Sequence, residues 1–324
     1  MTGDDQGASR PAFRDLRARM AAVGFFPSKT RGQNFLLDPA AHAAIAAAAL
    51  VGPGDVVLEI GTGLGFLTSA LLATGADVVS VEIDDRLHGL ARQLLAEGTP
   101  PQGVLDLVHA DALGPDGLAP AVTAALDHAR ARRGAATFTV AGNLPYSVSG
   151  PLVAALCCHE PLPRRMVLLL QKEMADRVVA GAGSRTYGTL SALSGVLYRG
   201  RLLRRVPPGA FQPRPNVDSA VLRLDAIEGC ATPVPSAAER RGFARFLRAL
   251  FAGRRKTLRN ALARAFPGDS PPDSSPVLAA LGILSAIRPE ACPPDRLLSL
   301  YRALAQMQGP AAAPGPHPPC DGSP

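Results

Sequence analysis

The stretch Val56-Val57-Leu58-Glu59-Ile60-Gly61-Thr62-Gly63-Leu64-Gly65 runs from a β-branched apolar segment directly into three closely spaced glycines. Glycines at such a point let the backbone turn tightly and approach a ligand, and the helix that follows begins with its N–H groups facing the same cleft. A dinucleotide site would need Gly-x-Gly-x-x-Gly, but position 66 is Phe66. The pattern therefore favours adenosine with an amino-acid tail and no pyrophosphate.

Strand-like and helix-like segments alternate on both sides of this stretch, from about residue 28 to about residue 225. The segments that read as strands are residues 56–60, 78–82, 105–109, 137–142, 166–170, 202–206 and 219–224. Amphipathic stretches lie between most of them, which is typical of an α/β fold with a mostly parallel sheet wrapped by helices. The Pro-rich segment 207–218 is expected to be a loop, because central strands exclude proline.

The composition changes along the chain and suggests four regions. Residues 1–27 are polar and irregular and are expected to be a flexible arm or a short helix. The α/β domain is predicted over 28–226, and Gly, Pro, Thr and Ser become frequent after it. Residues 238–306 show only helical patterning and predict a small all-α domain. The Pro/Gly/Ala-rich residues 309–324 are expected to be a disordered tail.

The charge and cysteine content narrow the class of protein. A net charge of +7 favours an anionic partner. Nine Lys or Arg and one acid lie between Ser236 and Arg264, and five Arg and no acid lie between Arg199 and Val217. Such clusters favour nucleic acid, although solvated helix faces can have the same composition.

The five cysteines form no Cys-x-x-Cys pair, so we expect no metal site and a cytoplasmic protein. No apolar run is long enough for a membrane span.

Two acidic residues follow the next two predicted strands. Glu82 closes the second strand, at about the distance beyond the glycines at which an acid contacts ribose hydroxyls in such folds. Asp111 follows the third strand and can accept a hydrogen bond from an adenine amino group. Taken singly, Glu82 also fits a solvated strand end, and Asp111 also fits a helix N-cap.

The segment Asn143-Leu144-Pro145-Tyr146 follows the fourth strand. The Asn143 side chain can accept a hydrogen bond from an amino group, and Pro145 keeps Leu144 out of helical geometry, so that its carbonyl can face a cleft. Tyr146 offers a face on which a base can stack. Asn-x-Pro is also a common turn, but its place beside the other strand ends predicts chemistry on an exocyclic amine.

Several further motifs occur in a characteristic order: Gly32-Gln33-Asn34-Phe35-Leu36, Glu59 to Gly65, Asn143 to Tyr146 with Ser149 and Pro151, Gln171-Lys172-Glu173, Tyr187-Gly188, Leu190-Ser191, Phe211 to Ser219, and Arg254 to Asn260. This ordered set resembles the small-subunit ribosomal RNA adenine N6,N6-dimethyltransferases, the KsgA family. That resemblance covers roughly residues 28–260. It implies a Rossmann-like class I S-adenosylmethionine-dependent methyltransferase fold, with a seven-stranded, mostly parallel sheet and a small helical C-terminal domain.

The resemblance also implies roles for particular residues. The S-adenosylmethionine contacts are implied to be Asn34, Leu36, Gly61, Glu82, Asp111 and Asn143. The pocket for the target base is implied to consist of Asn143, Leu144, Tyr146 and Phe211. The basic helix of the C-terminal domain is implied to bind RNA through Arg254, Arg255, Lys256 and Arg259. Thr62 departs from the family pattern, which often has proline there, and the segment 114–134 and the tail are longer than usual.

The implied reaction is the transfer of methyl groups to N6 of two adjacent adenines in the 3′-terminal hairpin loop of 16S ribosomal RNA, within an immature small subunit (pre-30S particle). Two alternatives remain open from the sequence: an erythromycin-resistance-type enzyme acting on 23S ribosomal RNA, and a ribosome-assembly factor without activity. We expect a monomer that makes no contact with membranes.

Overall fold

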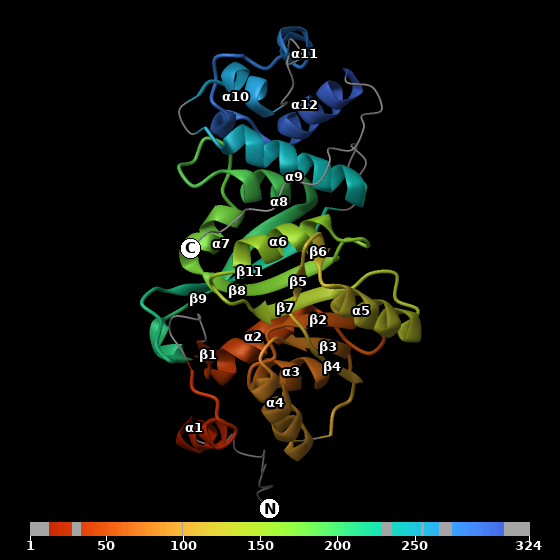
Figure 1. The fold of residues 1–324 in the computed structure, drawn as a ribbon, viewed down its shortest axis with the longest axis vertical. Helices are drawn as coiled ribbons and strands as arrows, with labels where there is room; N and C mark the ends of the chain where they lie inside the picture. The colour runs from red at the N-terminus through yellow and green to blue at the C-terminus, as the bar shows by residue number, and fades with distance from the viewer. Residues whose placement is uncertain are drawn as a thin grey trace, which may run out of the picture.

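The computed structural model describes residues 13–27, 34–98, 100–227, 235–253, 256–265 and 274–307. Its centre is a seven-stranded sheet in the order β4-β3-β2-β7-β8-β11-β9 (Figure 1). The strands are β2 (Val56–Ile60), β3 (Asp77–Glu82), β4 (Leu105–His109), β7 (Thr139–Asn143), β8 (Arg165–Gln171), β9 (Tyr198–Val206) and β11 (Ser219–Ala226). Strands β4, β3, β2, β7 and β8 are mutually parallel, whereas β11 is antiparallel to both β8 and β9. The prediction of a mostly parallel sheet is confirmed.

Helices cover both faces of this sheet because its strands are apolar on both sides. Val57 packs in one cluster with α2 (Pro39–Ala49) and α3 (Phe66–Leu72), whereas its neighbours Val56 and Leu58 pack in the other. That second cluster includes residues of α5 (Pro120–Arg133) and α6 (Ser149–Cys158). The sheet with its helices is therefore the α/β layer arrangement that the alternating segments predict.

Of the two alternatives for residues 1–27, the short helix is correct for the second half, and the first twelve residues lie outside the described part of the chain. Residues Phe13–Ala22 form α1, in which Leu16 and Met20 lie one helical turn apart and are buried. They pack with apolar residues of α4 (Asp85–Glu97), and Arg19 forms an ion pair with Glu97 at 2.7 Å. This apolar stripe therefore holds an otherwise polar helix against α4.

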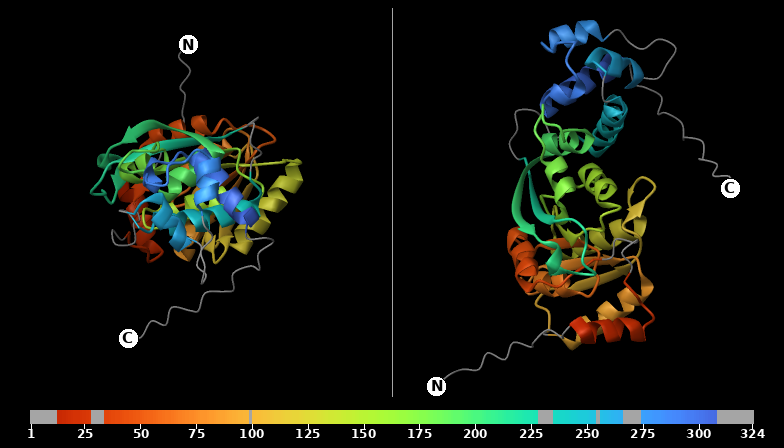
Figure 2. Two further views of the ribbon diagram at one scale, coloured as in Figure 1. Left: turned by 90° about the horizontal axis from the view of Figure 1, so that it is seen from above. Right: turned by 90° about the vertical axis from the view of Figure 1, so that its left-hand side faces the viewer.

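The remaining helices are α7 (Lys172–Val178), α8 (Thr189–Leu197), α9 (Ala237–Phe251), α10 (Leu258–Ala265), α11 (Ser275–Ala280) and α12 (Pro294–Met307), with short 3-10 turns η2 (Pro208–Ala210) and η3 (Pro289–Ala291). Of these, α9 to α12 lie at the end of the molecule opposite α1 (Figures 1 and 2). Buried residues of α9, α10 and α12 belong to the same hydrophobic cluster as β7 and β8. One core thus continues across the domain boundary predicted near residues 226–238. No helix in the described part of the chain is long and apolar enough to cross a membrane.

Two short strand pairs complete the fold. The pair β5 (Leu113–Gly114) and β6 (Gly117–Leu118) forms a hairpin at the start of the segment 114–134, which is longer than usual for the family that the sequence resembles. The pair β1 (Phe35–Leu36) and β10 (Phe211–Gln212) joins the N-terminal motif to the Pro-rich loop. The expectation that residues 207–218 contain no strand is therefore wrong at Phe211–Gln212, although this pair lies outside the main sheet.

Candidate active site

The glycine loop between β2 and α3 has the backbone geometry that only glycine adopts without strain. Gly61, Gly63 and Gly65 have φ values of 86°, 57° and 78°. A Cβ atom on Gly61 would lie 3.5 Å from the Asn143 carbonyl oxygen, so the loop also runs close to the end of β7. The ends of β2 and β7 thus meet at one edge of the sheet, where ligands bind in open α/β folds.

Glu82, the last residue of β3, is fixed beside this loop by two backbone donors. Its Oε2 accepts a hydrogen bond from the Gly63 N–H at 2.9 Å, and its Oε1 accepts one from the Asp84 N–H at 3.1 Å. Burial raises the pKa of the Glu82 carboxyl, while these N–H groups oppose that shift. Each carboxylate oxygen keeps acceptor capacity, so Glu82 can still receive hydrogen bonds from ribose hydroxyls.

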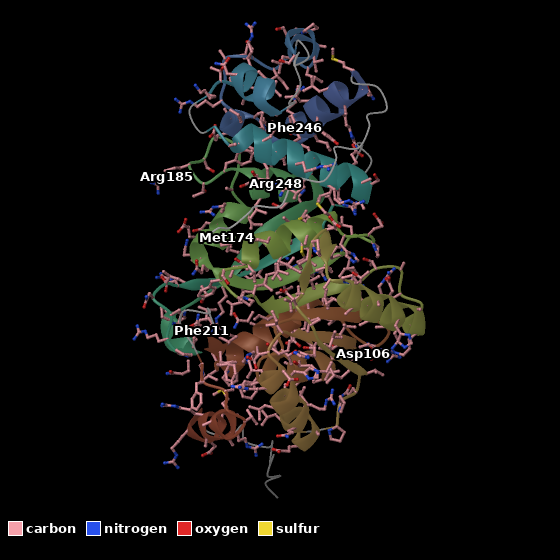
Figure 3. All side chains as sticks on the ribbon, viewed as in Figure 1. Asp106, Met174, Arg185, Phe211, Phe246 and Arg248 are labelled. Atoms are coloured by element: carbon pink, nitrogen blue, oxygen red, sulfur yellow. The ribbon has the colours of Figure 1, made fainter. Side chains whose placement is uncertain are left out.

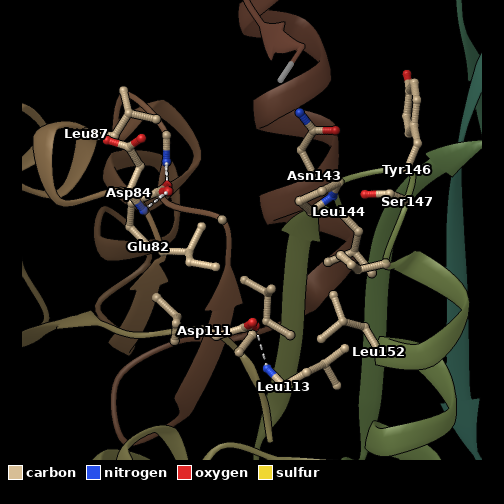
Figure 4. Close-up of a pocket in the computed structure, with 18 of the residues that line it drawn as sticks. Glu82, Asp84, Leu87, Asp111, Leu113, Asn143, Leu144, Tyr146, Ser147 and Leu152 are labelled. Atoms are coloured by element: carbon tan, nitrogen blue, oxygen red, sulfur yellow. Dashed lines mark hydrogen bonds between the residues drawn. The ribbon is translucent and has the colours of Figure 1, made fainter. Parts of the chain in front are cut away.

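Asp111 lies beyond the end of β4 at the same edge. The N-cap alternative is wrong, because β5 rather than a helix follows it. Its Oδ1 accepts a hydrogen bond from the Leu113 N–H at 2.9 Å, which fixes the carboxylate orientation (Figure 4). Within the described residues its Oδ2 has no hydrogen-bond partner, and the side chain is exposed. This oxygen is available to accept a hydrogen bond from an amino group.

Asn143, the last residue of β7, is oriented by the N-terminal motif. Its Nδ2 donates a hydrogen bond to the Asn34 carbonyl oxygen at 3.1 Å. With the NH₂ end of the amide held there, the side-chain oxygen remains as an acceptor on the pocket wall. The following Leu144 N–H donates to the Leu169 carbonyl at 3.2 Å, which ties the turn to β8.

Tyr146 lies on the β8 side of the same wall, and its hydroxyl is 2.7 Å from Ser219 Oγ at the start of β11. Burial raises the pKa of the Tyr146 phenol, and the hydrogen bond with Ser219 only partly opposes this. Ser149 Oγ donates to the Tyr146 carbonyl oxygen at 3.1 Å. The ring is therefore held at both its hydroxyl and its backbone, and it remains a neutral phenol.

These residues line one cavity of about 480 Å³, a size suited to a nucleoside with a side chain (Figure 4). The predicted residues Asn34, Gly61, Glu82, Asp111, Asn143, Leu144 and Tyr146 all line it. Sequence reasoning missed its apolar walls: Phe35, Ile83, Leu87, Leu113 and Leu152. Ile83 is 62% exposed directly after Glu82, and a large apolar residue exposed at a strand end was the available signal.

Two predicted site residues are not brought to this cavity. Phe211 is fully buried, and its backbone pairs with Leu36 in the β1–β10 pair. Both side chains pack in the α2 and α3 cluster, and neither lines the cavity. Figure 3 marks the position of Phe211. Apolar burial beneath α2 determines where both side chains point in this structure. The contact of Phe211 with the target base and that of Leu36 with the cofactor stay predictions.

Two of the four predicted RNA-binding residues, Lys256 and Arg259, lie on a different part of the molecule. Arg254 and Arg255 fall outside the described residues, as do Gly32 and Gln33 of the N-terminal motif. Lys256 precedes α10 and Arg259 lies within it, and both are exposed. Figure 1 shows α10 at the end of the molecule opposite α1.

In the described residues, no three His, Cys, Asp or Glu side chains are grouped as a metal site would require.

The cavity fits S-adenosylmethionine on its own geometry. The glycine loop gives backbone access, Glu82 is fixed where ribose hydroxyls would lie, and Asp111 presents a free acceptor beside apolar walls. With the mostly parallel seven-stranded sheet, this site defines a class I S-adenosylmethionine-dependent methyltransferase. More particularly, the chain belongs to the ribosomal RNA adenine dimethylase family, whose sequence model matches residues 27–305.

Individual relatives agree with this membership. The chain is 38% identical over 299 residues to the ribosomal RNA small subunit methyltransferase A of Phenylobacterium zucineum, covering 92% of this chain and 95% of the relative. It is 36% identical to the protein of the same name from Geobacter metallireducens, covering 90% of this chain and 100% of that one.

Two solved structures are similar over 84% of this chain. One is a dimethyladenosine transferase from Plasmodium falciparum, with a TM-score of 0.65, 26% identity and 98% of that chain covered. The other is the 23S rRNA methyltransferase ErmE, with a TM-score of 0.57, 25% identity and 100% of that chain covered.

Proposed function

We propose that this chain transfers methyl groups from S-adenosylmethionine to N6 of two adjacent adenines in the 3′-terminal hairpin loop of 16S ribosomal RNA, giving N6,N6-dimethyladenine. The proposal is supported by the orientation of the Asn143 side chain. Its amide NH₂ group donates to the Asn34 carbonyl oxygen at 3.1 Å, which leaves the amide oxygen facing the pocket. Curated relatives at 38% and 36% identity are named for the small subunit, which favours that substrate over 23S ribosomal RNA.

Asn143 and Leu144 together can orient the target nitrogen. The N6 lone pair of adenine is delocalised into the ring, which makes the amine a poor nucleophile. Hydrogen bonds from its two protons to the Asn143 side-chain oxygen and the Leu144 carbonyl favour a tetrahedral nitrogen with its lone pair directed away from the ring. When bound, S-adenosylmethionine supplies an electrophilic methyl group on a positively charged sulfur. Alignment of held reactants gives effective molarities of about 10⁵–10⁸ M.

Tyr146 provides the stacking face for the base. Its ring is fixed by the hydroxyl contact with Ser219 at 2.7 Å and lines the pocket next to Asn143. Base–aromatic stacking contributes about 1–3 kcal/mol per base. The new ammonium that methylation produces is acidic, so no strong general base is required, and a neutral Asn143 and a neutral phenol suit the reaction.

The substrate adenines are expected to lie unpaired in a hairpin loop. Unpaired bases are the easiest to extrude into such a pocket, which fits a hairpin loop. The exposed Lys256 and Arg259, with Arg254 and Arg255, would contact phosphates of the ribosomal RNA in an immature, pre-30S particle. We place the reaction in the cytoplasm and take the active form to be a monomer.

Asn143→Ala tests the assignment of the pocket. Removing one of the two acceptors should lower kcat by about 10²–10³-fold, the usual effect of deleting one positioned hydrogen-bonding group. The measurement is incorporation of labelled methyl into unmethylated small-subunit particles, with the fold checked by circular dichroism. Gln93→Ala, which removes an exposed amide on α4, is the matched control and should leave kcat unchanged. Undiminished activity of Asn143→Ala would exclude this pocket assignment.

The choice of substrate needs a separate comparison. Purified protein should label unmethylated small-subunit particles and leave protein-free 23S ribosomal RNA unlabelled. Label in 23S ribosomal RNA alone would identify the erythromycin-resistance-type alternative. No label in any RNA, with S-adenosylmethionine bound normally in calorimetry, would indicate an assembly factor without activity.

A further inference from the structure

A row of arginines lies along β9, the edge strand of the main sheet. Arg199 and Arg201 pair with Asp225 and Arg223 of β11, so both point to one face of the sheet. Both side chains are exposed, and β9 is bordered by β11 on one side only. Figure 1 shows β9 at the outer edge of the sheet, well away from α10.

An irregularity in the strand adds a third arginine to this row. The register between β9 and β11 shifts between Val221 and Leu222, so that Leu222 pairs with Leu202 whereas Val221 pairs with Arg204. In a regular strand Leu203 would be the next residue after Arg201 on this face of the sheet. Leu203 has no partner in the register, so it is the extra residue of a bulge. The side chains beyond it change faces, and Arg204 lies on the same face as Arg201. We call Arg199, Arg201 and Arg204 the β9 arginine row.

The row has more positive charge than the nearby acids neutralise. Asp225 already accepts hydrogen bonds from Arg165 at 2.5 Å and from Arg223 at 2.8 Å. Arg204 lies 3.4 Å from Asp38. Within the described residues, the side chains of Arg199 and Arg201 have no hydrogen-bond or ion-pair partner. Two guanidinium groups are therefore available to an external anion.

The row leads towards the active site. Arg204 pairs with Val221, which lies two residues from Ser219, the residue whose hydroxyl contacts Tyr146 at 2.7 Å. Alternate residues on one face of a strand are about 6.6 Å apart, and that spacing is comparable to the separation of successive phosphates along an RNA strand. A strand whose base enters the pocket can thus continue along β9.

We propose that the β9 arginine row binds the phosphate backbone of the substrate RNA next to the methylated loop, separately from the basic helix α10. This inference rests on the proposed function and specifies a second RNA contact for it. Arginine forks bind phosphate bidentately, and three on one strand face match a continuous polyanion better than a single small ligand. The competing explanation is that charges on an edge strand only prevent association between sheets.

The test is the double variant Arg199→Gln/Arg201→Gln, with binding to unmethylated small-subunit particles measured over a range of salt concentrations. Loss of two phosphate contacts should reduce the slope of log K against log salt by about 1.4–1.8, which is 0.7–0.9 for each contact. S-adenosylmethionine binding should not change, because neither residue lines the pocket. Arg199→Lys/Arg201→Lys should restore most of the slope.

Arg17→Gln/Arg92→Gln is the matched control, since it removes the same charge from exposed sites on α1 and α4. An equal loss of slope in this control would show a net-charge effect and overturn the inference. A wild-type slope in the Arg199→Gln/Arg201→Gln variant would also overturn the inference. So would self-association of that variant in light scattering together with unchanged binding to the particles. If the wild-type protein itself fails to methylate the particles, the proposed function fails instead, so the two failures are distinguishable.

Discussion

Glu59 is a completely buried carboxyl that the reaction does not use. Its Oε2 accepts hydrogen bonds from Thr68 and Ser80, each at 2.6 Å, and its Oε1 has no partner within the described residues. Ser80 donates its only proton to Glu59, so Thr62 Oγ1 must donate to Ser80 across their 2.6 Å contact. This chain of hydrogen bonds connects Thr62 of the glycine loop to β3 and α3.

Glu59→Gln tests whether this carboxyl is protonated in the folded protein. Burial raises its pKa from 4.5 to about 7, against the opposing hydrogen bonds from Ser80 and Thr68. Between these pH values the folded state binds a proton that the unfolded state has released, so wild-type stability falls as pH rises through this window. The free energy of unfolding of Glu59→Gln minus that of the wild type should therefore be about 3 kcal/mol larger at pH 7 than at pH 4.5.

Urea denaturation of both proteins across that pH range measures this difference. Glu173→Gln is the control, because Glu173 is an exposed carboxyl on α7. Its pH dependence should match that of the wild type. Parallel pH dependences for the wild type and Glu59→Gln would mean that Glu59 is ionised in the folded protein.

At the scale of elements, α1 supports one wall of the pocket. Its buried Leu16 and Met20 pack on α4, and Phe25 just after it contacts Phe35 edge-on, with 6.0 Å between ring centroids. Phe35 in turn lines the cofactor cavity. Docking of α1 therefore orders a segment of the site that the α/β sheet does not hold by itself.

Met20→Ala should loosen α1 without unfolding the sheet. Truncation of a fully buried Met costs about 2–5 kcal/mol, and here the cost falls on a peripheral helix that can open locally. Hydrogen exchange should show that the free energy of opening falls by about 2–5 kcal/mol for α1 amides and stays unchanged for β2 amides. Arg17→Ala, on the exposed face of the same helix, should change neither. Equal losses in α1 and β2 would show instead that α1 is part of the global core.

The strands and the residues at their ends were predictable, because β-branched runs and glycines act locally and parallel strands bring their carboxyl ends to one edge. The burial of Phe211 was not predictable, since it depends on the pairing of β10 with β1, which lies about 175 residues earlier in the chain. For residues 1–27 a flexible arm and a short helix both stayed open, because only Leu16 and Met20 mark the apolar face of α1.

For the whole molecule, the continuous core predicts how the chain unfolds. Leu247 of α9 is fully buried in the same cluster as Val140 and Leu168 of the sheet. A separate helical domain would have its own core, with few apolar contacts across the boundary. We therefore expect the C-terminal helices and the sheet to unfold together.

Leu247→Ala should lower the stability of both parts by the same amount. Deleting this side chain leaves a cavity at the junction and costs about 2–5 kcal/mol. Hydrogen exchange at increasing denaturant should show α10 and β2 amides opening together, at the same lowered free energy. Arg245→Ala, exposed on the same helix, should leave both unchanged. If α10 alone lost protection while β2 kept its wild-type opening free energy, residues 238–306 would be an autonomous domain, and RNA binding by α10 could then be separated from catalysis simply by cutting the chain between them.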